Sequence, residues 1–399
     1  MHEQRLDLDD FRHIAAGAAI LAGGGGGSYH DMQGILAELA ERGGYAPVAL
    51  RDYDGRTDAC VLAIMGSPDA ADAMTLEDIE QAISNTLAAC AQMGFVPGCA
   101  IAVETGPINS LVPLIAAALG QGQIAWVVDG DGAARAVPEL PQTTFGGCPE
   151  LPAGPGVVAD DSGNVSIPAE SAILNACSAA RMEALAGGVL SAFGGYAGVA
   201  LWPSTAANGH ALREAYIPGT LSQALALGRF LRSGATPRGA DEVATHITGI
   251  TGRKADLIAH NLYITEVMQT TTSASLDTGL IRLDNTPDPH DSTLSVYIYN
   301  LNENLLMYSN QSSAPLALAP DAICYYSERT GAGFSNATDD LAPYYDFSAG
   351  RSTGCPVSVI RVAADKRLVN APGVMSSFAQ LLRDLGYAGA LPTTGSEVS

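Results

Sequence analysis

Residues 99–132, CAIAVETGPINSLVPLIAAALGQGQIAWVVDGDG, contain two short apolar runs with a helical segment between them. The runs are Cys99–Val103 and Ile124–Val128. The apolar spacing predicts a helix over Ser110–Leu119, with Asn109 or Ser110 as its N-cap. Runs that are apolar at every position indicate strands buried on both faces, and a helix between two such strands is typical of a parallel sheet.

The same pattern extends over the N-terminal half of the chain, from Gly44 to about Pro138. Two earlier apolar runs, Ala46–Leu50 and Cys60–Met65, are followed by turn residues, and Leu76–Met93 has helical spacing. We therefore predict an α/β fold whose N-terminal domain has three layers and a mostly parallel sheet.

A segment rich in Pro and Gly, residues 138–168, predicts a linker and divides the chain into domains 1–168 and 169–399. The second domain begins with a predicted helical part, residues 169–238. Its expected helices cover Ser171–Leu185 and Thr220–Leu231.

Residues 239–370 are predicted to be rich in β-structure. Their β-branched and aromatic segments alternate with turn residues at fairly even spacing: Asn261–Thr272, Thr278–Leu283, Leu294–Tyr299, Ala322–Tyr326 and Val357–Val362. This pattern favours an antiparallel, β-barrel-like part. A terminal amphipathic helix is expected over residues 376–386.

Composition excludes several classes of partner. The chain of 399 residues carries 42 acidic and 20 basic side chains, a net charge of −22, which repels nucleic acid and anionic membrane surfaces. The Asp7, Asp9 and Asp10 carboxylates stand where a secretory signal needs positive charge, and the seven cysteines form no C-x-x-C spacing. We expect a cytoplasmic homo-oligomer with reduced thiols that acts on a small molecule.

Polar residues follow the predicted parallel strands at their carboxyl ends, where ligands bind in such sheets. Glu104 follows one strand, Asp129 and Asp131 follow another, and Asp52 follows a third. Asp and Gly are also common at strand ends because they form turns, so each residue alone is ambiguous. Together they predict a site at this edge of the sheet.

The glycines Gly23–Gly27 and the following Ser28 precede a predicted helix that ends near Arg42. The N–H groups of such a loop, Gly24, Gly25, Gly26 and Gly27 among them, can bind a ligand oxygen. A dinucleotide-binding motif needs a strand before the glycines, whereas Phe11, Ile14, Ala15, Ala18 and Leu21 favour a helix there. A ligand-facing loop and a flexible turn remain the alternatives.

Several motifs resemble the family named for S-methyl-thiohydantoin desulfurase, a bacterial group often encoded beside hydantoinases. They are the glycine loop, Glu104–Asn109 (ETGPIN), Asp129–Glu139 (DGDGAARAVPE), Tyr299–Leu305 (YNLNENL) and Ala319–Asp321 (APD). The resemblance covers nearly the whole chain, and the motif Asp129–Glu139 is its most specific part.

The resemblance implies an α/β domain followed by a domain with a β-barrel-like part. It also implies hydrolysis at the sulfur-bearing carbon of a five-membered thiohydantoin ring. The sequence departs from the family at Ala22, at Ala134 where a Gly is usual, and after Pro68, where no Glu-Lys pair follows. These departures put the identity of the substrate in doubt rather than the fold.

Hydrolysis at an sp² ring carbon needs a general base, a donor for the developing anion and an acid for the leaving group. The Asp129 and Asp131 carboxyls could act as base and acid, or they could share a divalent metal with Glu104. Arg135 could bind a substrate carboxylate or form a structural ion pair with Glu139.

Three further residues are candidates for substrate binding. Asn109 has the donor and acceptor that suit a cyclic amide. Asn302 and Glu303 belong either to a hairpin turn or to the cleft between the domains. The histidines have no metal-ligand spacing, and His30 is expected on a helix surface.

The sequence therefore predicts a hydrolase that acts on a hydantoin-like or S-methyl-thiohydantoin-like ring. One alternative is a non-catalytic binding or regulatory subunit that partners a hydantoinase-type enzyme. A nicotinamide-dependent oxidoreductase is the third possibility.

Overall fold

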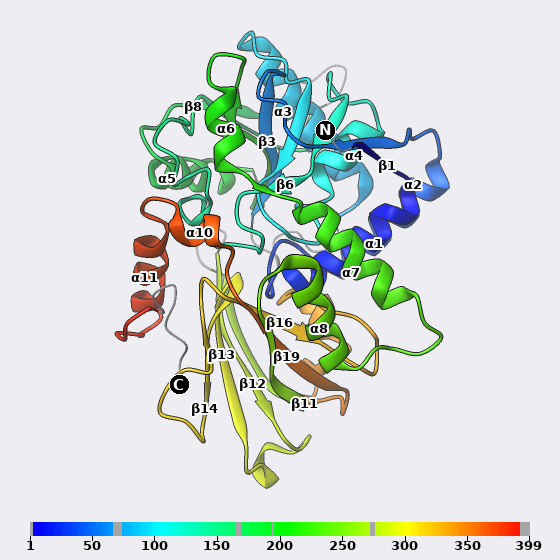
Figure 1. Ribbon diagram of the computed structural model, residues 1–399, viewed down its shortest axis with the longest axis vertical. Coiled ribbons are helices and arrows are strands. Elements are labelled where there is room, and N and C mark those ends of the chain that lie inside the picture. Colours follow the sequence, from blue (N-terminus) through cyan, green and yellow to red (C-terminus); the bar gives the residue numbers. More distant parts are fainter. Residues whose placement is uncertain (1–2, 67–73, 164–168, 194, 272–275, 392–399) are drawn as a thin grey trace.

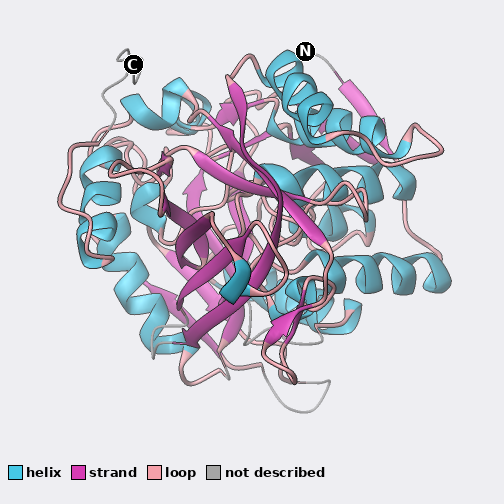
Figure 2. Ribbon diagram, turned by 90° about the horizontal axis from the view of Figure 1, so that it is seen from below, coloured by secondary structure: helices cyan, strands magenta, loops and turns pink. Residues whose placement is uncertain are grey.

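The computed structural model describes residues 3–66, 74–163, 169–193, 195–271 and 276–391. Figure 1 shows an α/β part above a barrel-like sheet, with helices α1 and α7 between them. Seen from below, in Figure 2, the strands cross the middle of the molecule and helices surround them. The predicted combination of an α/β part and an antiparallel barrel-like part is confirmed.

The first sheet has eight strands in the order β1-β2-β5-β4-β3-β9-β7-β8. They are β1 (Glu3–Leu6), β2 (Val48–Arg51), β3 (Ala59–Gly66), β4 (Cys99–Ala102), β5 (Trp126–Val128), β7 (Gly156–Ala159), β8 (Ser171–Leu174) and β9 (Tyr196–Ser204). The neighbours β2–β5, β5–β4 and β4–β3 are parallel, as predicted, and the outer strands pair antiparallel.

Both faces of the central strands β3, β4 and β5 are buried, which explains why these strands are apolar almost throughout. In β3, Cys60 and Leu62 belong to one hydrophobic cluster, while Val61 and Ala63 belong to the cluster on the opposite face. Helices α1 (Leu8–Leu21), α2 (Tyr29–Arg42), α3 (Leu76–Gln92) and α4 (Val112–Ala118) contribute to the first cluster, and α5 (Ala179–Leu190) and α6 (Gly209–Ala215) to the second.

The helix that precedes the glycines is confirmed, and Asp7 is its N-cap. The Asp7 side chain accepts a hydrogen bond from the Asp10 backbone, and the Asp10 side chain accepts one from the Asp7 backbone. The N-cap predicted for α4 is wrong, because the helix starts after Leu111 without a side-chain cap.

The helix predicted over Ser171–Leu185 is partly wrong. Residues Ser171–Leu174 form β8, which pairs with β7, and α5 begins only at Ala179 with Ser178 as its N-cap. The predicted boundary at residues 168/169 thus falls between two paired strands of the first sheet. Residues 169–238 also contain β9 and β10 (Ile217–Pro218), so they are not wholly helical; α7 (Thr220–Arg232) matches its prediction.

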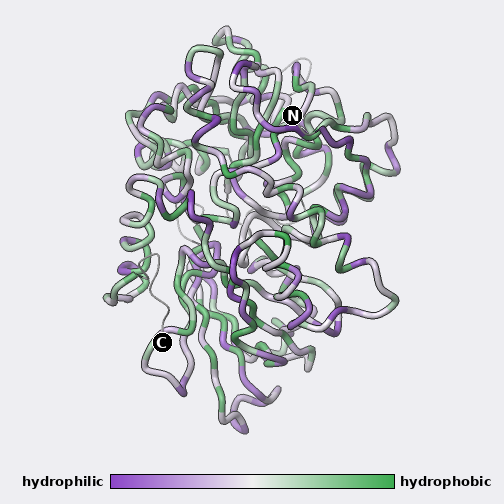
Figure 3. Tube along the Cα trace, in the orientation of Figure 1, coloured by the Kyte–Doolittle hydropathy of each residue, from purple (hydrophilic) through white to green (hydrophobic). Residues whose placement is uncertain are grey.

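The second large sheet is antiparallel, with the order β15-β14-β13-β12-β11-β19-β16. Its strands are β11 (Ala255–Thr271), β12 (Asp277–Asp284), β13 (Ser295–Leu301), β14 (Glu303–Ser309), β15 (Ala317–Leu318), β16 (Ala322–Tyr326) and β19 (Pro356–Val362). Figure 3 shows hydrophilic residues at the far end of this sheet, where the turn around η2 (Pro289–Asp291) lies.

Two elements of this part were not predicted from the sequence. Helix α8 (Ala240–Thr251) contains Val243, Ile247 and several Thr residues, which favour strands. Strand β14 begins with Glu303 and Asn304, which suggested a turn.

The remaining elements are short or terminal. They are β6 (Gly130–Asp131), η1 (Leu140–Gln142), α9 (Thr338–Leu341), β17 (Tyr345–Asp346), β18 (Arg351–Ser352), α10 (Lys366–Asn370) and α11 (Val374–Asp384). Helix α11 confirms the predicted terminal helix, and its Phe378 packs in one cluster with Ala133, Ala134 and Val137. None of the helices in the described residues is long and apolar enough to span a membrane.

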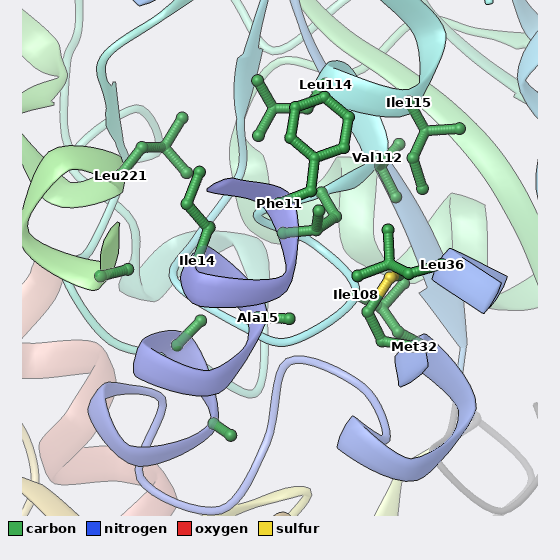
Figure 4. Packing of buried hydrophobic residues seen from close by; sticks show 14 of the residues in the cluster. Phe11, Ile14, Ala15, Met32, Leu36, Ile108, Val112, Leu114, Ile115 and Leu221 are labelled. Atoms are coloured by element: carbon green, nitrogen blue, oxygen red, sulfur yellow. The ribbon is translucent and has the colours of Figure 1, made fainter. Parts of the chain in front are cut away.

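Helices α1 and α7 cross at close range and join the α/β part to the barrel-like part. Gly17 of α1 lies against the backbone of Ala224, and Gly228 of α7 lies against the backbone of His13. Figure 4 shows Ile14 of α1 directed toward Leu221 of α7. The absence of side chains at the two glycines therefore sets how closely the helices approach.

A Gly17→Ala variant should lower the free energy of unfolding by about 2–4 kcal/mol, because its Cβ would overlap the Ala224 carbonyl oxygen. Gly34→Ala is the matched control. Gly34 lies on the exposed face of α2 with nothing within 4 Å of an added Cβ, so this variant should gain about 0.5–1 kcal/mol. Urea unfolding measures both changes, and equal effects of the two variants would contradict the close crossing.

Candidate functional site

A cavity of about 110 Å³ lies where the α/β part meets the barrel-like part. That volume can hold several water molecules or one small ring. The carboxyl ends of β3 and β4, the glycine loop and the turn between β13 and β14 surround it. Its polar lining consists of Glu104, Asn109, Glu139, Thr143, Glu183, Tyr196, Asn302 and Glu303.

The glycine loop borders this cavity, as predicted for a ligand-facing loop, through Gly26 and Gly27. An added Cβ at Gly25 would overlap the Glu303 carboxyl group, and one at Gly26 would overlap Gly106. The loop is therefore packed against protein on its other side, and it follows a helix rather than a strand. A dinucleotide-binding arrangement is not formed.

Ser28 is a structural residue at the end of the loop. It is the N-cap of α2, where its Oγ accepts a hydrogen bond from the Asp31 backbone. The same Oγ donates to the Asp340 carboxylate, which also accepts from the backbone of Tyr29 and His30. His30 itself is exposed on the helix surface, as predicted.

Two buried carboxyl groups face the cavity from different parts of the chain. Glu104 follows β4 and is 6% exposed, and Glu303 begins β14 and is 2% exposed. The Glu104 Oε1 accepts from Asn109 Nδ2 at 2.8 Å, and its Oε2 accepts from the Val137 backbone at 2.6 Å. The Glu303 Oε2 has no hydrogen-bond partner among the described residues.

Both carboxyl groups have raised pKa values. Burial raises the pKa of Glu104 to about 7, although the hydrogen bonds from Val137 and Asn109 lower it. Burial and the charge of Glu104 hold the pKa of Glu303 well above its usual range. Because two groups donate to the Glu104 carboxylate while Glu303 keeps an unpartnered oxygen, Glu303 is the member of the pair that holds its proton more strongly.

The two asparagines lie at the cavity, as predicted. Asn109 Oδ1 accepts from the Ile64 backbone at 3.2 Å, so both ends of its amide are engaged and fix the Glu104 carboxylate. Asn302 forms the turn between β13 and β14 with a φ of 55°, and its Oδ1 accepts from the Asp277 backbone. Both alternatives given for Asn302 and Glu303 therefore apply. The two residues start a hairpin strand, and they also line the cavity.

The predicted convergence of Asp129, Asp131 and Glu104 occurs only in part: the charge of Asp131 acts on Glu104, but neither aspartate lines the cavity and Asp129 lies apart. The Asp129 carboxylate accepts from the backbone and Oγ of Ser222, in a separate hollow that also contains Asp52. The Asp131 carboxylate is fully buried.

The Asp131 carboxylate accepts hydrogen bonds from the Thr105 Oγ1 and from the backbone N–H groups of Ala133 and Ala134. Burial raises the pKa of Asp129 and of Asp131, although the hydrogen bonds that each carboxylate accepts lower it. Within the described part of the chain, no group of three or more His, Cys, Asp or Glu side chains is arranged to hold a metal ion. The hypothesis of a divalent ion shared by Asp129, Asp131 and Glu104 therefore finds no arrangement that fits it.

Arg135 lies behind the cavity wall and is 1% exposed. Its guanidinium donates to four carbonyl oxygens, those of Ala136, Asn304, Pro320 and Asp321. The last three belong to β14 and to the segment before β16, so Arg135 links the two ends of the barrel-like sheet to the α/β part. Neither the predicted substrate clamp nor an ion pair with Glu139 is formed.

The two departures from the family pattern that lie in described residues sit in the same region. Ala134 has a φ of 55°, a left-handed conformation that favours glycine. The Ala22 carbonyl accepts from the Ala136 backbone. The positions that follow Pro68 lie outside the described residues.

Glu183 is a cavity residue that the sequence did not indicate. It projects from α5, and its Oε2 accepts from the Leu140 backbone at 2.9 Å. Burial and the charges of Glu139 and Glu104 raise its pKa to about 8. Because α5 is rich in Ala and Gly and was predicted with the wrong start, no sequence signal distinguished Glu183 from a surface residue.

Comparisons with known proteins agree with this architecture. A crystal structure of a protein from Chromobacterium violaceum is 27% identical, with a TM-score of 0.76 and 98% of each chain covered. No curated protein matches the chain. Two family models match, one described as S-Me-THD-like, N-terminal domain, over residues 9–170, and one as S-Me-THD-like, C-terminal domain, over residues 177–374. With both domains matched in order along the chain, it belongs to the S-Me-THD-like family.

Proposed function

We propose that this protein is a hydrolase that removes the sulfur substituent from an S-methyl-thiohydantoin-like ring. Water adds to the sp² ring carbon that carries sulfur, the C–S bond breaks, and methanethiol leaves as the carbon becomes a carbonyl. The family description supports this reaction class, and a hydantoin-like ring is the corresponding product. The observation that carries the proposal is the buried pair of Glu104 and Glu303 at one cavity.

The two carboxyl groups suit opposite roles. Glu104 keeps its charge more readily, because Asn109 and Val137 donate to its two oxygens, so it serves as the general base that takes a proton from water. Glu303 holds its proton, and its Oε2 has no partner among the described residues, so it serves as the acid for the leaving sulfur or a ring nitrogen.

Neighbouring groups can orient the ring. The Asn302 side chain accepts from Asp277 through Oδ1, and its Nδ2 has no hydrogen-bond partner among the described residues, so it can donate to a ring carbonyl. Apolar residues complete the cavity, including Ile64, Met65 and Val199. They limit the water that can reach the ring, which strengthens the hydrogen bonds formed inside.

The two alternative functions that the sequence leaves open make different predictions. A binding or regulatory subunit would bind the ring without turnover. An oxidoreductase would need a site for its cofactor, and the glycine loop follows helix α1 rather than the strand that a dinucleotide-binding motif needs.

Glu303→Gln should lower kcat by about 10²–10⁴-fold, because an amide cannot donate the acidic proton. The measurement is methanethiol release from an S-methyl-thiohydantoin, followed with a thiol reagent. Glu214→Gln, an exposed change on α6, is the control and should retain activity. Unchanged turnover in Glu303→Gln would contradict the role of Glu303 as the acid. Loss of activity in EDTA would contradict a mechanism that uses no metal ion.

Variants of the two cavity glutamates, Glu303→Gln and Glu104→Gln, should differ in stability. Because the folded-state pKa of Glu303 is raised, its burial is favourable at low pH and costs stability as pH rises above the ordinary value of 4.5. Glu303→Gln should therefore match the parent Tm at pH 5 and exceed it by about 2–4 °C at pH 8. Glu104→Gln should also lose activity but lower the Tm, because its amide would face the donors of Asn109 and Val137.

The dependence of kcat/KM on pH should show a limb near pH 7, where Glu104 loses its proton and activity rises. In Asn109→Ala a donor to the charged carboxylate is lost, so the pKa of Glu104 rises and this limb moves to higher pH. A limb that stays in place or moves to lower pH would contradict the role of Asn109 in holding Glu104.

A further inference from the structure

The acidic and basic side chains that line the cavity are all carboxylic acids. Glu104, Glu139, Glu183 and Glu303 line it, and no Lys, Arg or His does so among the described residues. None of the ion pairs found in the described residues involves these four glutamates. The guanidinium of Arg135 cannot turn toward a ligand, because four carbonyl oxygens hold it.

Two of these glutamates have no role in the hydrolysis proposed above. Glu183 projects from α5 seven residues before Leu190, so both lie on one face of the helix, and both line the cavity. One backbone N–H, that of Leu140, donates to Glu183, and Glu139 lies beside it as a like charge. A carboxyl group in these surroundings lacks a counter-charge, and a cationic ligand would supply one.

A second observation points to a ligand in the same cavity. The Glu303 Oε2 is buried and has no partner among the described residues. Apolar side chains line the same cavity, Ile64, Met65, Leu190 and Val199 among them. The cavity therefore combines polar groups for the ring, apolar side chains for a short alkyl chain and a carboxyl group for the end of that chain.

We propose that Glu183 selects rings whose substituent ends in an amine or a guanidine, and that the cavity rejects a substituent that ends in a carboxylate. This inference rests on the proposed function for the ring, and Glu183 is a specificity residue rather than a reacting group. An anionic substituent would be buried among carboxyl groups, and the Arg135 guanidinium, whose charge acts on Glu104 and Glu303 from behind the wall, is held by carbonyl oxygens and cannot bind it. Such burial of like charges weakens binding.

Three S-methyl-thiohydantoins with substituents of similar length at C5 test the proposal: 3-aminopropyl, butyl and 2-carboxyethyl. We expect kcat/KM to decrease in that order, with about 100-fold between the first and the last. Equal values for the cationic and anionic rings, or a preference for the anionic ring, would overturn the inference.

Variants at Glu183 assign the preference to this residue. Glu183→Gln should remove the advantage of the aminopropyl ring over the butyl ring while butyl turnover persists. Glu183→Lys should favour the carboxyethyl ring. Glu214→Lys changes the net charge equally on an exposed face of α6 and should leave the order unchanged, so an equal effect of both Lys variants would refute the assignment.

Binding of the corresponding hydantoins, which carry oxygen in place of S-methyl, separates this inference from the proposed function. Calorimetry at pH 7 in two buffers should show release of about one proton when the aminopropyl ring binds, because the cation draws Glu183 into its charged form. If no ring is turned over but the binding order holds, the hydrolase proposal fails and the charge preference stands. Turnover without a charge order or proton release would overturn the preference alone.

Discussion

The contact between the Gly25 backbone and the Glu303 carboxyl group determines how the two parts of this molecule meet. A side chain at position 25 would occupy the space of that carboxyl group, and one at position 26 would occupy the space of Gly106. Because both positions are glycine, the start of β14 reaches the carboxyl end of β4, and Glu303 of the barrel-like sheet lies near Glu104. The cavity and the raised pKa values of its carboxyl groups both follow from this approach.

The acidic string after β5, Asp129–Glu139, supports this arrangement from behind the cavity wall. Asp129 holds α7 through Ser222, and Asp131 holds the turn that contains Ala134 in a left-handed conformation. That turn directs the Arg135 guanidinium to the barrel-like sheet and brings Val137 to Glu104. Residues whose chemistry resembles that of catalytic groups thus position the cavity without lining it.

Much of the fold could be predicted from the sequence, because strands buried on both faces must be apolar throughout, as in Cys60–Met65 and Cys99–Val103. Strand β8 and helix α8 could not be predicted in this way, because Ala and Thr are compatible with either conformation and pairing with β7 or packing on β11 decides between them. Among the site residues, Glu104, Asn109, Asn302, Glu303, Gly26 and Gly27 line the cavity.

Asp129, Asp131 and Arg135 do not line it, because the order of strand ends along a sheet does not determine where a side chain points. The strand order β2-β5-β4-β3 places Asp52 and Asp129 beside each other and separates them from β3. Glu183 depends on how α5 packs against η1, a contact between segments far apart in sequence.

The four hydrogen bonds of Arg135 also bear on how this family can evolve. A buried guanidinium needs acceptors on every side, and here three of its four carbonyl partners come from the barrel-like sheet. An α/β part joined to an unrelated second domain would keep the cation and lose most of its acceptors, a loss that costs several kcal/mol. The N-terminal matched segment therefore depends on the C-terminal one, because the backbone carbonyl oxygens that satisfy its buried cation belong to the second segment.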